Sequence, residues 1–236
     1  LALGMPEIDC EVGTEDIQGG LTSRDTFENF LKLLVQGCEE RNLPKPTCIV
    51  GQTGTLTRMD KNIGRFDQVQ TRELAAIAAQ YGVGFKEHNG DYLSAASCRI
   101  HPALGVTGLN VAPEFGLVET DACLALADLE QKLAREGWVK EEETSHFREL
   151  LTEAAFNSSP WEKWMSSEVK KQAREKTESD TALRMLIARV CGHYVYDMTS
   201  MIEARTTLFR NINTYGLQEG AQQFVMAKVR ESIEFY

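Results

Sequence analysis

The sequence predicts an α/β fold built from strand-helix repeats over residues 1–140, followed by a helical extension over residues 141–236. Two observations predict this class. A short apolar segment typical of a strand alternates with helical segments, and this rhythm recurs four times before residue 140. Beyond that point the chain has only helical character. Strands that alternate with helices of this length form right-handed βαβ units, and we therefore expect a parallel sheet.

Local signals support each expected helix. The helix after the first strand is amphipathic, with an acidic residue, Asp25, in its first turn. Its apolar face carries Phe27, Phe30, Leu31, Leu34 and Val35. The next two helices end at Gly82 and Gly137, and glycine readily adopts the left-handed conformation that closes a helix. We expect strands over residues 7–16, 46–55, 83–91 and 106–116, and helices over 22–42, 71–82 and 120–137.

The extension after residue 140 reads as a series of helices, one of which opens with Ser-Ser-Pro and has Pro160 near its first turn. His146 and His193 lie in helical contexts without partners at ligand spacing, so we expect structural roles for both. We expect core or interface positions for Trp161, Trp164, Tyr194 and Tyr196.

Composition excludes several classes of protein. The net charge of −10 argues against a nucleic-acid-binding surface, which normally carries a basic patch. No apolar run reaches the length of about 18 residues needed to span a bilayer, and no signal-type leader precedes the first strand. The cysteines show no C-x-x-C spacing, so we expect reduced thiols and a cytoplasmic location. They are Cys10, Cys38, Cys48, Cys98, Cys123 and Cys191.

Polar residues follow each expected strand. Carboxyl ends of parallel strands meet at one edge of a sheet, where active sites of α/β proteins gather. We therefore expect a site there, although strand ends also become polar simply because buried sequence gives way to loop. The residues concerned are Glu15, Asp16, Gln52, Thr53, the run from Glu87 to Asp91, Asn110 and Glu114.

The segment GFKEHNGDYL, residues 84–93, contains the densest chemistry. One interpretation is a divalent metal, of Zn or Mn type, held by Glu15, His88 and one further carboxylate from Glu87, Asp91 or Glu114. The other is proton exchange between two carboxylates across a bound polyol. Period-two alternation turns Glu87 away from Lys86 and His88, which favours His88 and Asp91 for a common pocket. In both interpretations Gln52, Asn89 and Asn110 would bind substrate hydroxyls, as Glu114 could.

These residues also carry a resemblance. GTEDIQGG (13–20) resembles the Gly-Thr-Glu-x-x-x-Gly-Gly signature of the Z-type, non-catalytic subunits of class II D-tagatose-1,6-bisphosphate aldolase, and FKEHNGDY (85–92) is similar to that family's Phe-x-x-His-x-x-Asp-Tyr segment. LNVAPEF (109–115) matches a strand end of the family, and residues 147–164 and 186–212 resemble its C-terminal helices. The likeness covers nearly the whole chain in order.

The resemblance implies a TIM-barrel-like fold, of which this chain would be the C-terminal half with four βα units, preceded in the natural protein by further sequence. It implies carbohydrate metabolism, either metal-assisted retro-aldol or epimerase chemistry on a ketose or ketose phosphate, or a non-catalytic role that supports a class II aldolase partner in an oligomer. Such proteins are also called tagatose-6-phosphate kinases, but no phosphate-binding loop occurs here. On this reading Glu15, His88 and Asp91 are catalytic, and Glu15 and His88 hold the metal.

The chain departs from the family at three strand ends. TGTLTRMDKNIGRFD follows Gln52 where the family has a run with an acid and a histidine. Lys86 stands where the family has a glutamate, and Glu114 where it has a small residue. The substrate, and activity itself, are therefore expected to differ from the namesake.

Overall fold

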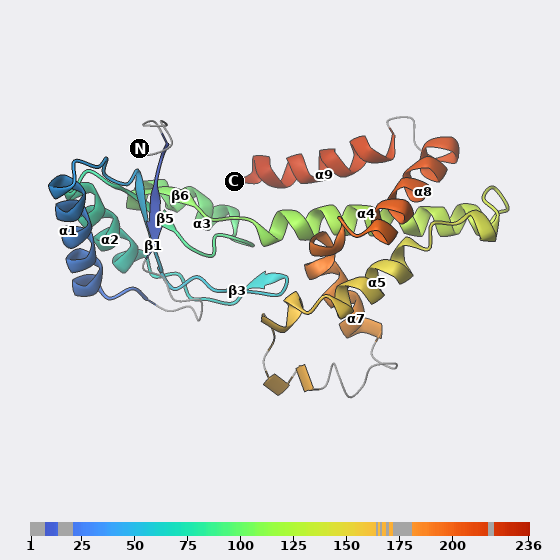
Figure 1. The fold of residues 1–236 in the computed structure, drawn as a ribbon, viewed down its shortest axis with the longest axis horizontal. Coiled ribbons are helices and arrows are strands. Elements are labelled where there is room, and N and C mark those ends of the chain that lie inside the picture. Colours follow the sequence, from blue (N-terminus) through green and yellow to red (C-terminus); the bar gives the residue numbers. More distant parts are fainter. Residues whose placement is uncertain are drawn as a thin grey trace. The chain divides into compact units, whose positions relative to one another are not determined.

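The structure is a computed structural model that describes residues 8–13, 21–163, 165, 167–168, 170–171, 181–216 and 220–236. Contacts within the chain group it into two compact units, which we call unit 1 (Leu1–Val111) and unit 2 (Ala112–Tyr236). Each unit is described by itself (Figure 1). The division into domains at residues 140 and 141 stays a prediction.

Unit 1 is built on a sheet of four parallel strands in the order β1-β2-β5-β6. Sheet neighbours therefore follow one another along the chain, apart from a small hairpin, and right-handed crossovers then place successive helices on one face. This one-directional order is typical of barrel-type repeats, whereas doubly wound sheets reverse direction. The strands are β1 (Glu11–Gly13), β2 (Cys48–Gly51), β5 (Gly84–Glu87) and β6 (Val106–Leu109). The predicted parallel α/β sheet is confirmed; among the described strands it stays open, and the half-barrel remains a prediction.

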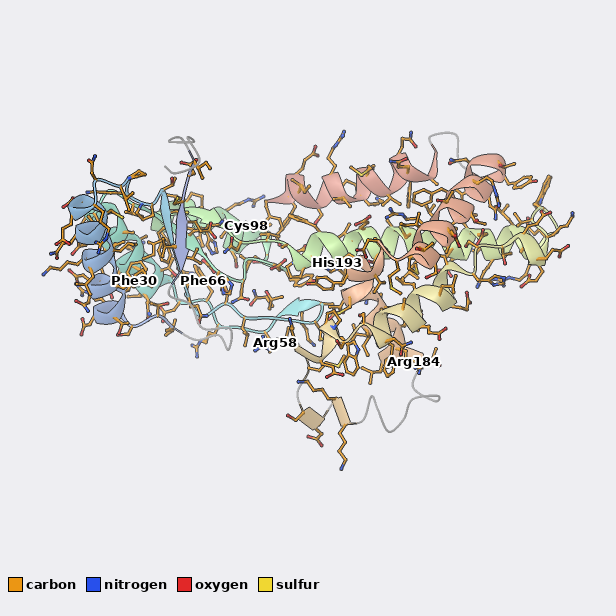
Figure 2. The ribbon with its side chains drawn as sticks, in the orientation of Figure 1. Phe30, Arg58, Phe66, Cys98, Arg184 and His193 are labelled. Carbon is orange, nitrogen blue, oxygen red and sulfur yellow. The ribbon has the colours of Figure 1, made fainter. Side chains whose placement is uncertain are left out.

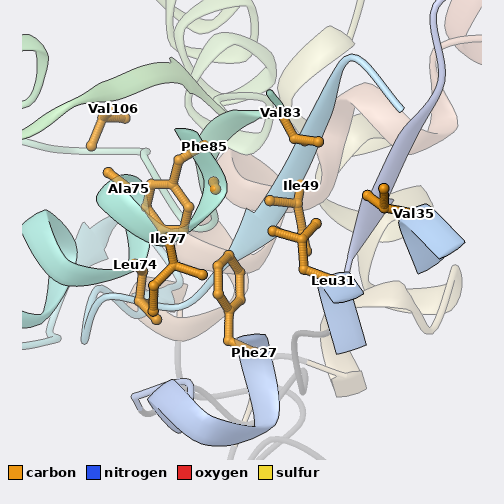
Figure 3. Close-up of a cluster of buried hydrophobic side chains, with 11 residues drawn as sticks. Phe27, Leu31, Val35, Ile49, Leu74, Ala75, Ile77, Val83, Phe85 and Val106 are labelled. Atoms are coloured by element: carbon orange, nitrogen blue, oxygen red, sulfur yellow. The ribbon is translucent and has the colours of Figure 1, made fainter. Parts of the chain in front are cut away.

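Two helices cover the same face of this sheet. The predicted apolar face of α1 (Arg24–Glu40) buries Phe27, Leu31 and Val35, and α2 (Gln68–Gln80) buries five residues beside them. They pack on Ile49 and Phe85, which are register partners on β2 and β5 (Figure 3). The rings of Phe27 and Phe85 meet edge to face, 5.8 Å between centroids, an arrangement that aromatic quadrupoles favour. Helix α2 ends at Gln80, two residues before Gly82, whose φ of +71° confirms the predicted stop.

Two connections were not predicted. Antiparallel strands β3 (Thr57–Arg58) and β4 (Lys61–Asn62) form a hairpin between β2 and α2, with Arg58 on it (Figure 2). Between β5 and β6 the chain forms the short helix α3 (Ala95–Ile100), capped by the Ser94 side chain, and a 3₁₀ turn over Pro102–Leu104. Strands of two residues are too short to show alternation, which explains why the pattern missed the hairpin.

Unit 2 is helical, and α4 (Pro113–Arg135) packs against each of the other helices named here. These are α5 (Phe147–Asn157), α7 (Thr181–Cys191), α8 (Thr199–Tyr215) and α9 (Ala221–Phe235). Pro113 at the first turn of α4 starts the helix seven residues before the expected residue 120, because proline has no N–H to leave unpaired there. The expected strand over 106–116 is therefore too long.

Side chains of unit 2 occupy several expected positions. Trp161 and Tyr196 are buried, whereas Tyr194 is half exposed and Trp164 lies outside the described residues. The ring of His193 lies against α4, where a Cβ at position 116 would come within 2.4 Å of its Nδ1 atom, so that position requires glycine (Figure 2). Burial lowers the pKa of His193. This packing agrees with the structural role expected for it.

Candidate functional site

The carboxyl ends of β2, β5 and β6 are joined by backbone hydrogen bonds. The His88 amide donates to the Gly51 carbonyl at 3.2 Å, and the Asn110 amide donates to the Glu87 carbonyl at 2.9 Å. The Gly90 amide in turn donates to Asn110 at 2.8 Å. The structure therefore brings the residues that follow these three strands to one edge of the sheet, as the parallel pattern predicts.

The loop after β5 has an unusual backbone. Asn89 and Tyr92 have φ angles of +57° and +58°, in the left-handed region that residues with a Cβ rarely adopt. Each such residue costs about 1–2 kcal/mol, less for asparagine, and persists only where its surroundings enforce it. Strain of this kind concentrates at functional sites, so the loop that carries His88 is a strong candidate for one.

Asn62, at the end of the β3–β4 hairpin, holds the backbone of this loop in its conformation. Its Nδ2 atom donates to the carbonyls of Asn89 at 3.0 Å and Asp91 at 3.1 Å. Its Oδ1 atom accepts from the amides of Leu56 at 3.1 Å and Gly64 at 3.2 Å. Every donor and both acceptor positions of the amide are thus used. Sequence reasoning missed Asn62, because nothing local marks a side chain that bonds a backbone 27 residues away.

The His88 ring lies half-buried at this edge. Its Nδ1 atom is 3.0 Å from the Asn89 Nδ2 atom, which is also 3.5 Å from the Thr55 carbonyl oxygen. The Thr55 hydroxyl donates to the His88 carbonyl at 2.7 Å. Two predicted partners lie deeper in the protein: Asp91 is 3% and Gln52 is 4% exposed. The backbone of Gln52 is held on both sides by Thr22, at 2.8 and 3.1 Å.

Glu87 points away from this group. Its Oε2 atom is 2.6 Å from Nε2 of His101, and both side chains are almost fully buried. The Nδ1 atom of His101 bonds the Ser97 carbonyl at 2.5 Å, and Phe66 stacks on the ring with 4.5 Å between ring centroids. Burial lowers the pKa of His101, but its bonds to Glu87 and Ser97 and the charge of Glu87 raise it by more. Glu87 is therefore engaged in a buried pair. Alternation along the strand predicts the direction of its side chain but not its partner.

Lys86 faces the other side of β5, as the alternation predicts. Its Nζ atom is 2.5 Å from Glu11 Oε2 on β1, reaching past the intervening β2. The Cys48 thiol lies 3.9 Å from the same carboxylate. Burial, and then the charge of Glu11, raise the pKa of Cys48. A lysine in so close an ion pair is a weak nucleophile, so we assign it no covalent role.

Two predicted residues do not belong to this edge as the structure describes it. Glu15 lies outside the described residues, so its contact with His88 stays a prediction. Glu114 belongs to unit 2, in the first turn of α4, where its carboxylate accepts a hydrogen bond from the Tyr236 hydroxyl. Within the described ranges no three His, Cys, Asp or Glu side chains gather closely enough to hold a metal ion.

A hollow of about 250 Å³ lies in unit 2 between α4 and α5, and none of the predicted site residues lines it. Its most buried carboxylate, Glu130, accepts from the amide and hydroxyl of Ser145 and from the Asn211 side chain. Arg148, also in its lining, pairs with Asp128 at 2.5 Å. Because these polar groups already satisfy one another, the hollow is a structural junction and we place the functional site in unit 1.

Fold and site together define a parallel βα-repeat protein with a polar edge. The structure resembles the crystal structure of a probable tagatose 6-phosphate kinase from Sinorhizobium meliloti 1021, with a TM-score of 0.69 and 19% identity over 96% of this chain and 61% of that one. It also matches a fructuronate-tagaturonate epimerase from Cohnella laeviribosi, with a TM-score of 0.49 and 14% identity over 97% of this chain and 44% of that one.

The first likeness shows a shared fold, and the chain spans less than two thirds of that neighbour's length. No protein-family model and no curated protein matches the sequence. None of the helices that the structure describes is both long and apolar enough to cross a membrane.

Proposed function

We propose that this chain belongs to a carbohydrate-metabolism protein that binds a ketose or ketose phosphate at the edge formed after β2, β5 and β6, and acts on it by retro-aldol or epimerase chemistry. The observation that carries the proposal is the half-buried imidazole of His88 on a strained loop that also carries the buried Asp91. The backbone of this loop is bonded to Gly51, the neighbour of the buried Gln52. The resemblance to the aldolase Z-type family and the fold shared with a probable tagatose 6-phosphate kinase support the substrate class.

In the proposed reaction Asp91 moves the proton and His88 stabilises the charge that develops. A base, Asp91, takes the proton of the ketose C4 hydroxyl, the C3–C4 bond breaks, and its electrons form an enolate at the former carbonyl. His88 donates a hydrogen bond to the enolate oxygen, where charge develops. Rotation of the aldehyde before the bond re-forms inverts C4, and Asp91 then returns its proton to the C4 oxygen. In an aldol cleavage Asp91 instead gives that proton to C3 of the enolate, and the two carbonyl fragments are released. Gln52, Asn89 and Asn110 would bind the remaining hydroxyls.

The resemblance also implies a divalent metal on Glu15 and His88, which when bound would polarise the ketose carbonyl. A histidine that binds a metal donates its other ring N–H to an acceptor. The neighbour of His88 Nδ1 is instead the amide nitrogen of Asn89, at 3.0 Å, so the ring does not fit that role. We therefore route no step of the reaction through a metal.

Conversion of labelled sugars tests the proposal. The chain would be incubated with ¹³C-labelled ketohexoses, their 6-phosphates and their 1,6-bisphosphates, and C4 inversion or cleavage would be followed by NMR. We expect one of these to react, with the rate reduced at least about 100-fold in His88→Gln and Asp91→Asn, the usual scale for loss of a general acid or base. His146→Gln, in unit 2, is the matched control. If the chain neither converts nor binds any of these sugars, the proposal is overturned.

A second candidate is a non-catalytic subunit that stabilises or activates a class II tagatose-bisphosphate aldolase. One observation favours it: the loop where the family has an acid and a histidine is here a hairpin whose Asn62 serves the backbone. Co-expression with such an aldolase would decide, because this candidate requires a stable complex and a higher aldolase activity that survive His88→Gln. Absence of a complex would eliminate it.

A further inference from the structure

We infer that Asn89 is a positioning residue that, in the neutral form of His88, places the ring proton on Nε2, so that His88 presents a proton donor at the strand edge. The tautomer itself follows from the local hydrogen bonds. Only its use on a sugar oxygen rests on the proposed function.

The assignment begins with the Thr55 carbonyl, which can only accept. The Asn89 amide therefore turns its nitrogen toward Thr55, at 3.5 Å, and the same nitrogen lies 3.0 Å from Nδ1 of His88. An amide NH₂ group has two hydrogens to donate and accepts none, so Nδ1 must be the acceptor. A neutral imidazole carries one ring proton, which is then on Nε2.

The amide has little freedom to turn over. A flipped Asn89 would bring its oxygen against the Thr55 oxygen, placing two acceptors together. The backbone is fixed as well, since Asn89 is held at a φ of +57° and its carbonyl accepts from Asn62 at 3.0 Å. Asn62 is thus a second positioning residue, which acts on His88 through Asn89.

This arrangement differs from that of a metal ligand. A histidine that binds a metal through one nitrogen donates its other N–H to a carboxylate, carbonyl or water. His88 instead accepts a hydrogen bond at Nδ1 and keeps its proton on Nε2, the atom that would need a free lone pair to bind a metal. A neutral imidazole in this state can polarise a carbonyl or stabilise an enolate oxygen by hydrogen bonding.

Long-range ¹H–¹⁵N spectra of the ¹⁵N-histidine-labelled chain at pH 8.5 read the tautomer directly. The chain has four histidines, so loss of one set of signals in His88→Gln assigns the ring. We expect a protonated Nε2 and an unprotonated Nδ1 at His88. Asn89→Asp replaces the donor by an acceptor and should reverse the pattern. Asn42→Asp is the matched control, because Asn42 is also left-handed, at a φ of +51°, and is exposed at the end of α1.

Zinc provides an independent readout. Equimolar Zn²⁺ should leave the His88 signals of the parent chain unshifted, while Asn89→Asp should bind Zn²⁺ about 10- to 100-fold more tightly, the usual value of a second partner for a ligating histidine. A parent chain with its proton on Nδ1, or with His88 bound to zinc through Nε2, overturns the inference even if Asn89→Asp fails to fold. A correct tautomer without any sugar conversion would instead count against the proposed function alone.

Discussion

Removing one partner of the Glu87–His101 pair tests whether unit 1 depends on it. His101→Leu would leave the Glu87 carboxylate inside the protein with 0% exposure and no opposite charge at 2.6 Å. A buried charge left in this way costs about 3–5 kcal/mol, whereas replacing both members with apolar residues of similar size is often neutral. We therefore expect His101→Leu to destabilise unit 1 strongly and the double variant Glu87→Met, His101→Leu to recover most of that loss.

Amide hydrogen exchange of peptides from β5 and β6 is the suitable assay. Since about 1.4 kcal/mol corresponds to a tenfold change, exchange limited by opening of unit 1 should accelerate by about 10² to more than 10³-fold in the single variant. All three tryptophans lie after residue 137, in unit 2, so their fluorescence monitors a part of the chain that should not change. Glu39→Ala, which breaks the exposed pair with Lys45, should cost less than about 1 kcal/mol and serves as the control.

The same pair sets a pH dependence with a definite sign. Because the pKa of His101 is raised in the folded state, its protonated form contributes stability that is complete below the unfolded pKa of about 6.5 and is lost as pH rises through the folded pKa. Exchange corrected for its intrinsic pH dependence should thus show unit 1 weakening above that range. The reasoning is refuted if the single and double variants lose the same stability of unit 1 and if its hydrogen exchange, corrected for the intrinsic effect, does not depend on pH.

Three other outcomes follow from the packing. Asn62→Ala removes four backbone hydrogen bonds and should loosen residues 53–67 by about 2–4 kcal/mol, seen as faster exchange there; unchanged protection would contradict this. Glu130→Ala leaves the polar partners of a carboxylate that is 3% exposed without an acceptor and should lower the free energy of unfolding by about 2 kcal/mol or more, seen as a lower urea midpoint in tryptophan fluorescence; an unchanged midpoint would count against it. Burial raises the pKa of Cys123 to about 12 and of Cys191 to about 11, so iodoacetamide at pH 8 should modify exposed Cys10 and spare both; mass spectrometry of the peptides checks this.

The features that sequence predicted well are those with a local cause. The four-residue spacing of Phe27, Leu31 and Val35, close to the 3.6 residues of a helical turn, is enough to define the buried face of α1, because the spacing alone decides which side chains share a side. Gly82 and Gly137 close their helices because both need a positive φ, which glycine adopts without strain. These effects operate within one or two turns of chain and can be read without the rest of the protein.

What sequence could not supply is contact between distant segments. The expected strand over residues 46–55 is only Cys48–Gly51, since pairing ends where the neighbouring strands end and polarity does not mark that point. His101 attracted no attention, because it lies 14 residues after Glu87 and only the turn through α3 brings them together. The contribution of Asn62 is equally invisible, since its partners lie on another strand end.

The titratable run from Glu87 to Asp91 shows how backbone geometry separates residues that are adjacent in sequence. Alternation along β5 sends Glu87 into the buried pair with His101 and away from Lys86, which pairs across the opposite side. The strand ends at Glu87, His88 is half-buried at the edge, and Asp91, which follows the left-handed Asn89, is buried on the same loop. Three ionisable groups within five positions therefore have three environments. Their proximity in sequence is therefore not evidence that they hold one metal ion together.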